Sequence, residues 1–276
     1  MVGSVNLDLV VRLSRLPAAG ETVSDGEFTS HPGGKGGNQA LAARRLGGEV
    51  NLVTAVGDDP QAESALKLLR QAGVDLERCW AIEGIATGVA LIMVGKEGEN
   101  MIGVAPGASR LLTAHSLELR PAENVLAQLE IPLETVVAAS RTAGYFALNA
   151  APARPLPREV LVRADLVVVN EVERDFYQHE LDQVAGMVVV TLGRAGAVAF
   201  RQGRPLARAT SPQVQVVDTV GAGDAFVAAL TLALIDGTGI KQALERACAA
   251  GALASTRPGA QPSMPTSAEV DAIIRS

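Results

Sequence analysis

Two aspartates flank a glycine loop in the segment Asp218-Thr-Val-Gly-Ala-Gly-Asp224, which runs directly into an apolar helical pattern over 225–235. Glycine lets backbone N–H groups approach an anion closely, and the N-terminus of the following helix adds positive partial charge. The carboxylate of Asp224 would lie in the first turn of that helix, where it stays ionised and can accept a proton from a substrate hydroxyl. The segment therefore predicts a phosphate site beside a general base, although Asp is also favoured at ordinary helix starts.

A second segment, His31-Pro-Gly-Gly-Lys-Gly-Gly-Asn-Gln39, places glycines on both sides of Lys35 just before another helical pattern. It is not a Walker A loop, because Lys35 is not followed by Ser or Thr, and it lacks the spacing of a dinucleotide-binding fingerprint. Its bare backbone can approach a polyhydroxylated ligand, and Lys35 and Asn38 supply donors that match sugar oxygens. A flexible turn before a helix is the alternative interpretation.

Two further polar segments lie where apolar runs end, and ligands of open α/β sheets bind at the carboxyl ends of strands. The first is Asn170-Glu-Val-Glu173, whose oxygens suit a hydrated magnesium ion. The same spacing of Asn and Glu is also that of a helix capping box. The second, Thr191-Leu-Gly-Arg-Ala-Gly196, can present its backbone to a nucleotide or form an ordinary turn.

The elements that must position these segments alternate between apolar strand-like runs and helical patterns. The strand-like runs are 52–56, 145–148, 166–169 and 187–191, and the helical patterns include 38–46, 61–71 and 225–235. Gly47, Gly73 and Gly237 stand where helix ends are expected. Nearly all-apolar strands are buried on both faces, so the alternation predicts a parallel sheet covered by helices on both sides.

Two stretches, 9–13 and 87–104, break this alternation with β-branched or alternating residues. The second is expected to fold back as a hairpin about Lys96-Glu-Gly-Glu99. Together they predict a small antiparallel flap, which could exclude water from a phosphoryl-transfer site. An ordinary edge hairpin explains the pattern equally well.

Composition excludes several classes of protein. The 276 residues are 48% hydrophobic, which is enough for a continuous core, and the net charge of -6 argues against a nucleic-acid partner. The two cysteines, Cys79 and Cys248, are far apart and suit a reducing cytoplasm. No apolar run is long enough to cross a bilayer, and the first residues do not read as a secretory signal, so a cytoplasmic protein without membrane contact is expected.

In combination, these segments resemble the ribokinase-like, or phosphofructokinase-B-type, family of carbohydrate kinases. The matching features span nearly the whole chain and follow in the family's order. They are Gly3-Ser-Val-Asn-Leu-Asp8, the glycine–lysine stretch, Asn149-Ala-Ala-Pro-Ala-Arg154, 170–173, 191–196, 218–224 and Thr256-Arg-Pro-Gly-Ala-Gln-Pro-Ser263. The glycine–lysine stretch and the Gly-Ala-Gln-Pro-Ser segment most resemble the ribose-phosphorylating members.

The resemblance implies a fold and an activity. The expected fold is a single α/β domain over 1–276, with a three-layer α/β/α core of about nine mostly parallel strands. A small β-sheet lid from about 9–30 and 86–105 would mediate homodimerisation. The expected activity is ATP-dependent phosphorylation of the primary 5-hydroxyl of D-ribose, with Mg²⁺ and with K⁺ as monovalent activator. Deoxyribose, another furanose, a nucleoside, or a non-catalytic sensor of sugars or nucleotides remain the alternatives.

The resemblance also assigns roles to residues. Asp224 would be the base, and the amides of Gly221, Ala222 and Gly223 would form the anion hole. The residues implied to hold the sugar are Asn6, Leu7, Asp8, Gly34, Lys35, Gly36, Gly37, Asn38, Glu130 and Asp224. Those implied to contact the nucleotide are Asn170, Thr191, Leu192, Gly193, Arg194, Ala195, Gly196, Gly223, Asp224 and Cys248. Those implied to hold cations are Glu173 for magnesium and Asp218, Val220, Ala254, Arg257, Gly259 and Ser263 for potassium.

Three departures from the family's pattern stand out. Only Met1 and Val2 precede the Gly3-to-Asp8 segment, where family members have several residues. The stretch between Asn170 and Thr191 has room for about one helix instead of two elements. Cys248 stands where many relatives carry Asn or His, so a purine contact there would differ.

Overall fold

Short apolar runs form a six-stranded sheet in the computed structural model, which describes residues 1–120 and 123–275. In spatial order the strands are β12 (Arg204–Ala209), β11 (Ala197–Arg201), β10 (Met187–Thr191), β9 (Leu166–Asn170), β8 (Tyr145–Asn149) and β7 (Asn124–Ala127). Strands β7 to β10 are parallel, whereas β11 and β12 extend the sheet in antiparallel fashion. The runs expected at 145–148, 166–169 and 187–191 are confirmed as three neighbouring strands.

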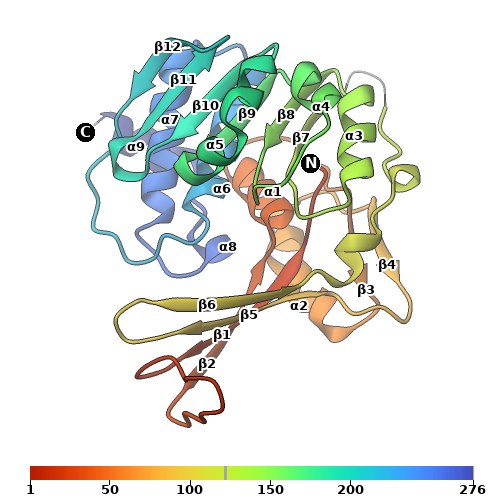
Figure 1. The fold of residues 1–276 in the computed structure, drawn as a ribbon, viewed down its shortest axis with the longest axis vertical. Coiled ribbons are helices and arrows are strands. Elements are labelled where there is room, and N and C mark those ends of the chain that lie inside the picture. The colour runs from red at the N-terminus through yellow and green to blue at the C-terminus, as the bar shows by residue number, and fades with distance from the viewer. Residues whose placement is uncertain (121–122, 276) are drawn as a thin grey trace.

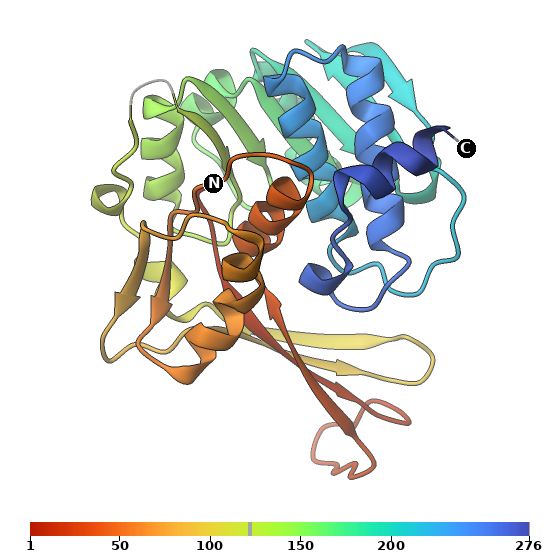
Figure 2. The same ribbon diagram turned by 180° about the vertical axis from the view of Figure 1, so that it is seen from behind.

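Helices cover both faces of this sheet (Figures 1 and 2). One face carries α3 (Leu133–Thr142), α4 (Arg158–Arg163) and α5 (Glu171–Tyr177), and the other carries α1 (Lys35–Arg45), α6 (Ala222–Ile235), α7 (Ile240–Ala254) and α9 (Ser267–Arg275). Successive residues of β9 alternate between the two cores: Leu166 and Val168 pack in one, Val167 and Val169 in the other. The predicted three-layer α/β/α architecture is confirmed.

Strand β3 (Thr54–Gly57) pairs in parallel with β4 (Cys79–Ile82), beside the six-stranded sheet. Among the described residues, two isolated bridges made by Val2 join the two: Val2 pairs with Val53 on one side and with Ala127 on the other. Its N–H donates to the Leu126 carbonyl at 3.0 Å, and the Gly3 N–H donates to the Val53 carbonyl at 3.1 Å. The continuity of the sheet at this point therefore depends on the first residues of the chain.

A second sheet projects from the body (Figure 1). This projecting sheet consists, in order, of β2 (Glu27–Gly33), β1 (Asn6–Arg12), β5 (Gly88–Val94) and β6 (Asn100–Ala105). The hairpin expected at 87–104 is confirmed: β5 and β6 are antiparallel, and the Gly95 N–H donates to the Glu99 carbonyl at the turn. Strand β1 carries the sheet back to the body, because Asn6 at its start is buried.

The remaining elements are short or peripheral. They are α2 (Pro60–Ala72), α8 (Ala260–Ser263) and the 3₁₀ helices η1 (Gly107–Leu111), η2 (Ala114–Ser116), η3 (Gln178–Gln183) and η4 (Gly193–Ala195). Gly47, Gly73 and Gly237 all have positive φ just beyond α1, α2 and α6, as expected for helix ends. In the residues that the structure describes, no helix is long and apolar enough to span a membrane.

Candidate active site

Helix α6 begins at Ala222, three residues before the expected pattern, and places Asp224 in its first turn. Gly221 precedes the helix with φ of 80°, a left-handed conformation that glycine adopts without strain. Asp224 is only 7% exposed, and its two carboxylate oxygens accept from Asn38 Nδ2 at 2.8 Å and Gln39 Nε2 at 2.9 Å. Burial raises the pKa of Asp224, while Lys35 and the two amide donors act in the opposite direction.

The glycines around Lys35 allow close packing of the protein against itself. A Cβ on Gly36 would lie 2.5 Å from the backbone of Gly3, and one on Gly33 would lie 2.3 Å from the Asp8 carboxylate. Gly34 has φ of 84° and lies against the backbone of β1. At these positions the glycine backbone therefore faces other protein atoms. Close packing explains these glycines, in addition to the predicted contact with a ligand.

Lys35 stands among carboxylates at the start of α1. The backbone N–H of Lys35 donates to Glu130 Oε2 at 3.0 Å, and the Ser4 hydroxyl donates to the same oxygen. Burial lowers the Lys35 pKa, but the charges of Asp224, Glu130 and Glu173 outweigh burial, so that the pKa is raised. Lys35 is thus a cation held beside the start of α6.

Strand β1 brings Asp8 toward the same charges. Burial, followed by the charges of Glu130 and Asp224, raises the pKa of Asp8 to about 7. Two buried amide oxygens in this region, Asn6 Oδ1 and Asn38 Oδ1, have no hydrogen-bond partner among the described residues. They are acceptors that a ligand's hydroxyl groups can satisfy.

Next to Asp224 lies a polar cavity of about 220 Å³. It brings together predicted residues from five parts of the chain. Its lining includes Lys35, Asn149, Asn170, Glu173, Thr191, Thr219, Gly221, Gly223 and Asp224. A phosphoryl group fits this combination of cation, helix start and buried carboxylate.

A second cavity of about 460 Å³ shares Thr191, Thr219 and Gly223 with the first. Of the residues predicted for a nucleotide, Thr191, Gly193, Arg194, Gly196, Gly223 and Cys248 line it. Leu192 and Ala195 are not among its lining residues, whereas Asn170 and Asp224 line the polar cavity. Sequence reasoning missed the segment 211–216 and Phe226, which complete the wall and have no motif of their own.

The segment 170–173 forms the capping box that the spacing allowed. The Asn170 side chain accepts from the Glu173 N–H, and Glu173 Oε2 accepts from the Asn170 N–H, both at 2.8 Å. Across 1–120 and 123–275, no group of three or more His, Cys, Asp or Glu residues is arranged to hold a metal ion. One oxygen of Glu173 thus has a structural role, although Glu173 is also among the residues that line the polar cavity.

The carboxylate of Asp218 connects the glycine loop to the segment before α8. Its Oδ1 accepts from the Val220 N–H at 3.0 Å, and its Oδ2 accepts from the Gly259 N–H at 2.9 Å. Ser263 donates to the Ala260 carbonyl, and the Arg257 guanidinium pairs with Glu269. The structure thus joins Asp218, Val220 and Gly259 directly, and gives the side chains of Arg257 and Ser263 partners within the protein.

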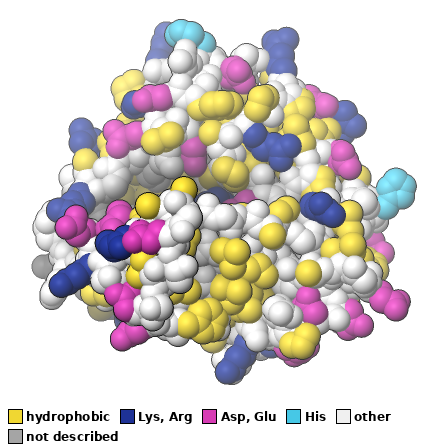
Figure 3. Space-filling model, turned by 60° about the horizontal axis from the view of Figure 1, so that its bottom comes forward, with side chains coloured by type: hydrophobic (Ala, Val, Ile, Leu, Met, Phe, Trp, Pro, Cys, Tyr) yellow, Lys and Arg dark blue, Asp and Glu magenta, His cyan; other side chains and the backbone are white. Residues whose placement is uncertain are grey.

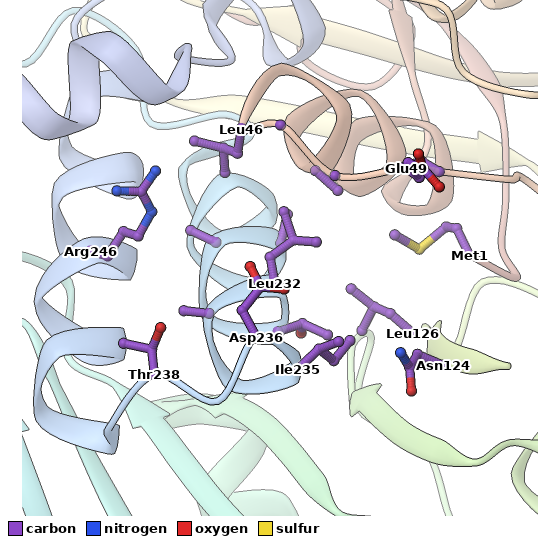
Figure 4. A pocket seen from close by; sticks show the side chains of 18 of the residues that line it. Met1, Leu46, Glu49, Asn124, Leu126, Leu232, Ile235, Asp236, Thr238 and Arg246 are labelled. Atoms are coloured by element: carbon purple, nitrogen blue, oxygen red, sulfur yellow. The ribbon is translucent and has the colours of Figure 1, made fainter. Parts of the chain in front are cut away.

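A larger cavity, about 980 Å³, lies elsewhere, between the ends of α1 and α6 and the edge of β7 (Figure 4). Met1, Leu46, Asn124, Leu126 and Leu232 are among its lining residues, and no predicted site residue lines it. Met1, Val53 and Leu126, which lie at or next to the bridges made by Val2, also line it. We place the candidate active site at Asp224 instead, because the predicted residues gather there.

Comparison with known proteins matches residues 1–267 to the family described as pfkB family carbohydrate kinase. A ribokinase of Bacillus subtilis (strain 168) is 37% identical over 289 residues, covering 99% of this chain and 98% of that protein. The ribokinase structure from Thermotoga maritima matches with a TM-score of 0.92 at 30% identity, covering 100% of this chain and 98% of that one. The Arabidopsis thaliana ribokinase, solved with ribose and ATP, matches with a TM-score of 0.86 at 30% identity, covering 100% and 97%. The chain therefore belongs to the pfkB family of carbohydrate kinases.

Proposed function

We propose that this chain phosphorylates the primary 5-hydroxyl of D-ribose with ATP, giving ribose 5-phosphate and ADP. The observation that carries this proposal is the position of Asp224, a buried carboxylate at a helix start that lines the polar cavity. Its neighbour Gly223 lines both this cavity and the larger, nucleotide-sized one. The ribokinases with which the chain aligns over nearly its full length support the choice of sugar.

In this reaction Asp224 accepts the proton of the sugar hydroxyl as its oxygen attacks the γ-phosphorus and the bond to the ADP oxygen breaks. The amides of Gly221, Ala222 and Gly223 stabilise the transferring group's negative charge, and Lys35 adds a buried positive charge. ATP occupies the 460 Å³ cavity, with its terminal phosphate directed toward Gly223, which lines both cavities.

The sugar lies between β1 and the start of α1. The unpaired acceptors Asn6 Oδ1 and Asn38 Oδ1 receive hydroxyl protons, and the Asp8 carboxylate can accept from two adjacent hydroxyls. Ile102 and Val104 lie on the same face of the projecting sheet as Asp8, because Asp8 pairs with Ala90 and Ala90 with Val104. With these apolar side chains beside Asp8, the projecting sheet would act as a lid that excludes water from the transfer.

Two cations complete the proposed site. Magnesium would neutralise charge on the phosphates and would be held near Glu173, which lines the polar cavity. Potassium would be held by the Asp218 carboxylate with oxygen atoms of the segments around Val220, Ala254, Arg257, Gly259 and Ser263. Asp218 already ties the glycine loop to Gly259, so a cation there would order the anion hole.

The outer face of the lid supports a homodimer. Phe28, Leu91 and Met101 share this face in the strand register and are each at least half exposed. Figure 3 shows apolar side chains gathered on the part of the surface that this sheet forms. A cytoplasmic location accords with the use of ATP and with two cysteines that form no disulfide.

The proposal is tested by measuring ADP production with purified protein and a panel of sugars. Asp224→Asn should reduce turnover at least a thousandfold while nucleotide still binds, because one carboxylate is lost from a retained cavity. Binding without turnover by the wild type would instead indicate a sensor of sugars or nucleotides.

The choice of ribose is tested by comparing it with 2-deoxyribose. Buried acceptors left without a hydroxyl partner should lower kcat/KM for deoxyribose at least tenfold, and equal efficiency would contradict the proposed substrate. Higher activity in KCl than in NaCl at equal ionic strength would support the potassium site, and no difference would contradict it.

A further inference from the structure

Asp224 is held from its buried side by a residue to which none of the motifs assigns a role. Helix α1 presents two consecutive amides to the carboxylate, Asn38 to Oδ2 and Gln39 to Oδ1. Gln39 is fully buried, so it can act on a substrate only through the residues that it contacts, of which Asp224 is one.

The Gln39 amide joins four elements of the body. Its Nε2 donates both to Asp224 Oδ1 at 2.9 Å and to Asn149 Oδ1 at 3.0 Å, at the end of β8. Its Oε1 accepts from the Nε2 of Gln128, just after β7, at 2.6 Å. Gln128 is also fully buried and lies against Gly3, where a Cβ would come within 2.0 Å of its Oε1.

The direction of this hydrogen-bond chain is determined at the sheet. The Val168 carbonyl can only accept, so the Asn149 amide must direct its Nδ2 toward it, at 3.2 Å, and its Oδ1 toward Gln39. Gln39 must then direct its NH₂ group toward Asn149 and Asp224, and its oxygen toward the Gln128 donor. A flipped Gln39 would place oxygen against two acceptors, which fixes its orientation.

The consequence concerns the charge of the base. Burial favours the protonated form of Asp224, and the groups that face it are Lys35, which opposes protonation, and Glu130 and Asp8, which favour it. The amide donors of Asn38 and Gln39 stabilise the ionised form that accepts a proton. Because Asn38 is itself a proposed sugar contact, whereas Gln39 is fully buried, Gln39 is the donor to Asp224 that does not also contact the sugar.

We propose that Gln39 is the positioning residue of the catalytic base, orienting the Asp224 carboxylate and keeping it ionised, with Asn149 and Gln128 fixing the direction of its amide. This inference rests on the proposed function for the role of Asp224. It adds a specific residue pair, Gln39 and Gln128, whose contribution can be measured separately from turnover.

The test compares wild type with Gln39→Met, which keeps the size of the side chain and removes its hydrogen bonds. The acidic limb of kcat/KM should move to higher pH by about one unit, because a hydrogen bond to a charged group contributes about a tenfold preference for that charge. At pH 6 the loss of kcat should exceed the change in KM for ATP, and activity should partly recover at pH 9. An unmoved acidic limb in a folded variant would overturn the proposal.

A direct titration separates this inference from the proposed function. The ¹³C carboxyl resonance of Asp224, assigned by its absence in Asp224→Asn, should titrate about one unit higher in Gln39→Met, whether or not the protein turns over sugar. Gln261→Met is the matched control, since Gln261 is also fully buried but donates to the Gly33 carbonyl instead. It should leave the Asp224 titration unchanged, and an equal shift there would overturn the proposal.

If Gln39→Met does not fold, Gln128→Met tests the proposal instead. Gln128 makes no hydrogen bond to Asp224. It acts only through Gln39, because its Nε2 donates to Gln39 Oε1. The variant should shift the Asp224 titration in the same direction by a smaller amount. A Gln128→Met protein with an unchanged titration and an unchanged acidic limb would contradict the role given to the chain of amides.

Discussion

At the scale of single residues, Asp8, a proposed sugar contact, also makes the stability of the protein depend on pH. Its pKa rises on folding from 3.8 to about 7, so between these values the native state binds more protons than the unfolded state. Stability therefore falls as the pH rises through this window, and the cost is complete above pH 7.

Replacing Asp8 should reverse that cost. Asp8→Asn is expected to raise the melting temperature at pH 8 by at least about 2 °C, and to have little effect near pH 4, because only the ionised carboxylate is destabilising. Differential scanning calorimetry at the two pH values measures this, with the exposed Asp58→Asn as control. An equal effect at both pH values would show that packing, not charge, is responsible.

The sequence could predict residues that follow a strong local pattern. Asp224 was predicted in the first turn of its helix, and it lies there because Gly221 ends the loop in a left-handed conformation. Gln39 was not predicted, because one glutamine in an apolar helix has no local signal and its partners lie about 90 to 185 positions away in the chain. The spacing of Asn170 and Glu173 could not by itself separate a capping box from a cation site.

At the scale of elements, the start of α6 depends on Gly221. A non-glycine residue in the left-handed region costs about 1–2 kcal/mol, and a Cβ here would lie 2.9 Å from the backbone of Ala260. Gly221→Ala should therefore displace the loop amides and lower kcat at least tenfold. The control is Gly237→Ala at the other end of α6, which has φ of 78° and open space around it. It should lose similar stability and keep kcat, as shown by melting curves beside steady-state kinetics.

The first strand makes a second prediction at this scale. The amine of Met1 donates to the Asn51 carbonyl at 2.9 Å and lies at the 980 Å³ cavity. Burial lowers its pKa from 8.0 to about 6, with Glu123 opposing, so the unfolded state binds more protons between these values and stability rises with pH through them. N-terminal acetylation removes the charge and should raise the melting temperature at pH 6, with little change at pH 9. The same gain at both pH values would contradict this explanation.

The positions of the strands and helices could be predicted from apolar periodicity, but the pairing between the strands could not. The runs at 145–148, 166–169 and 187–191 became β8, β9 and β10, since each is apolar on both faces. The run at 52–56 begins as a strand only at Thr54, where it pairs with β4 from Cys79 onward, and Val53 just before it makes only an isolated bridge to Val2. Long-range pairing of this kind is not encoded in a local pattern.

At the scale of the whole molecule, the projecting sheet has apolar side chains on both faces, and the two faces have different expected partners. The register places Ile102 and Val104 on the face of Asp8, while Phe28, Leu91 and Met101 lie on the opposite face. The inner face can close over a sugar, but within one chain nothing among the described residues buries Leu91, which is 60% exposed. A second copy of the chain is the partner that would cover it.

If a second copy covers the outer face, a charge placed on that face should change the oligomeric state, whereas the same charge on the body should not. Leu91→Glu should dissociate the dimer, because a carboxylate at the centre of an apolar interface is costly to desolvate unless it is paired. Val172→Glu, on the body helix α5 with 76% exposure, is the matched control and should leave the mass in solution unchanged. Sedimentation velocity of the two variants and the wild type measures the difference. A monomeric wild type would show that the outer face has another role, and so would a Leu91→Glu protein with the wild-type mass. If Leu91→Glu is instead a monomer with weakened ribose affinity, dimerisation holds the lid in place.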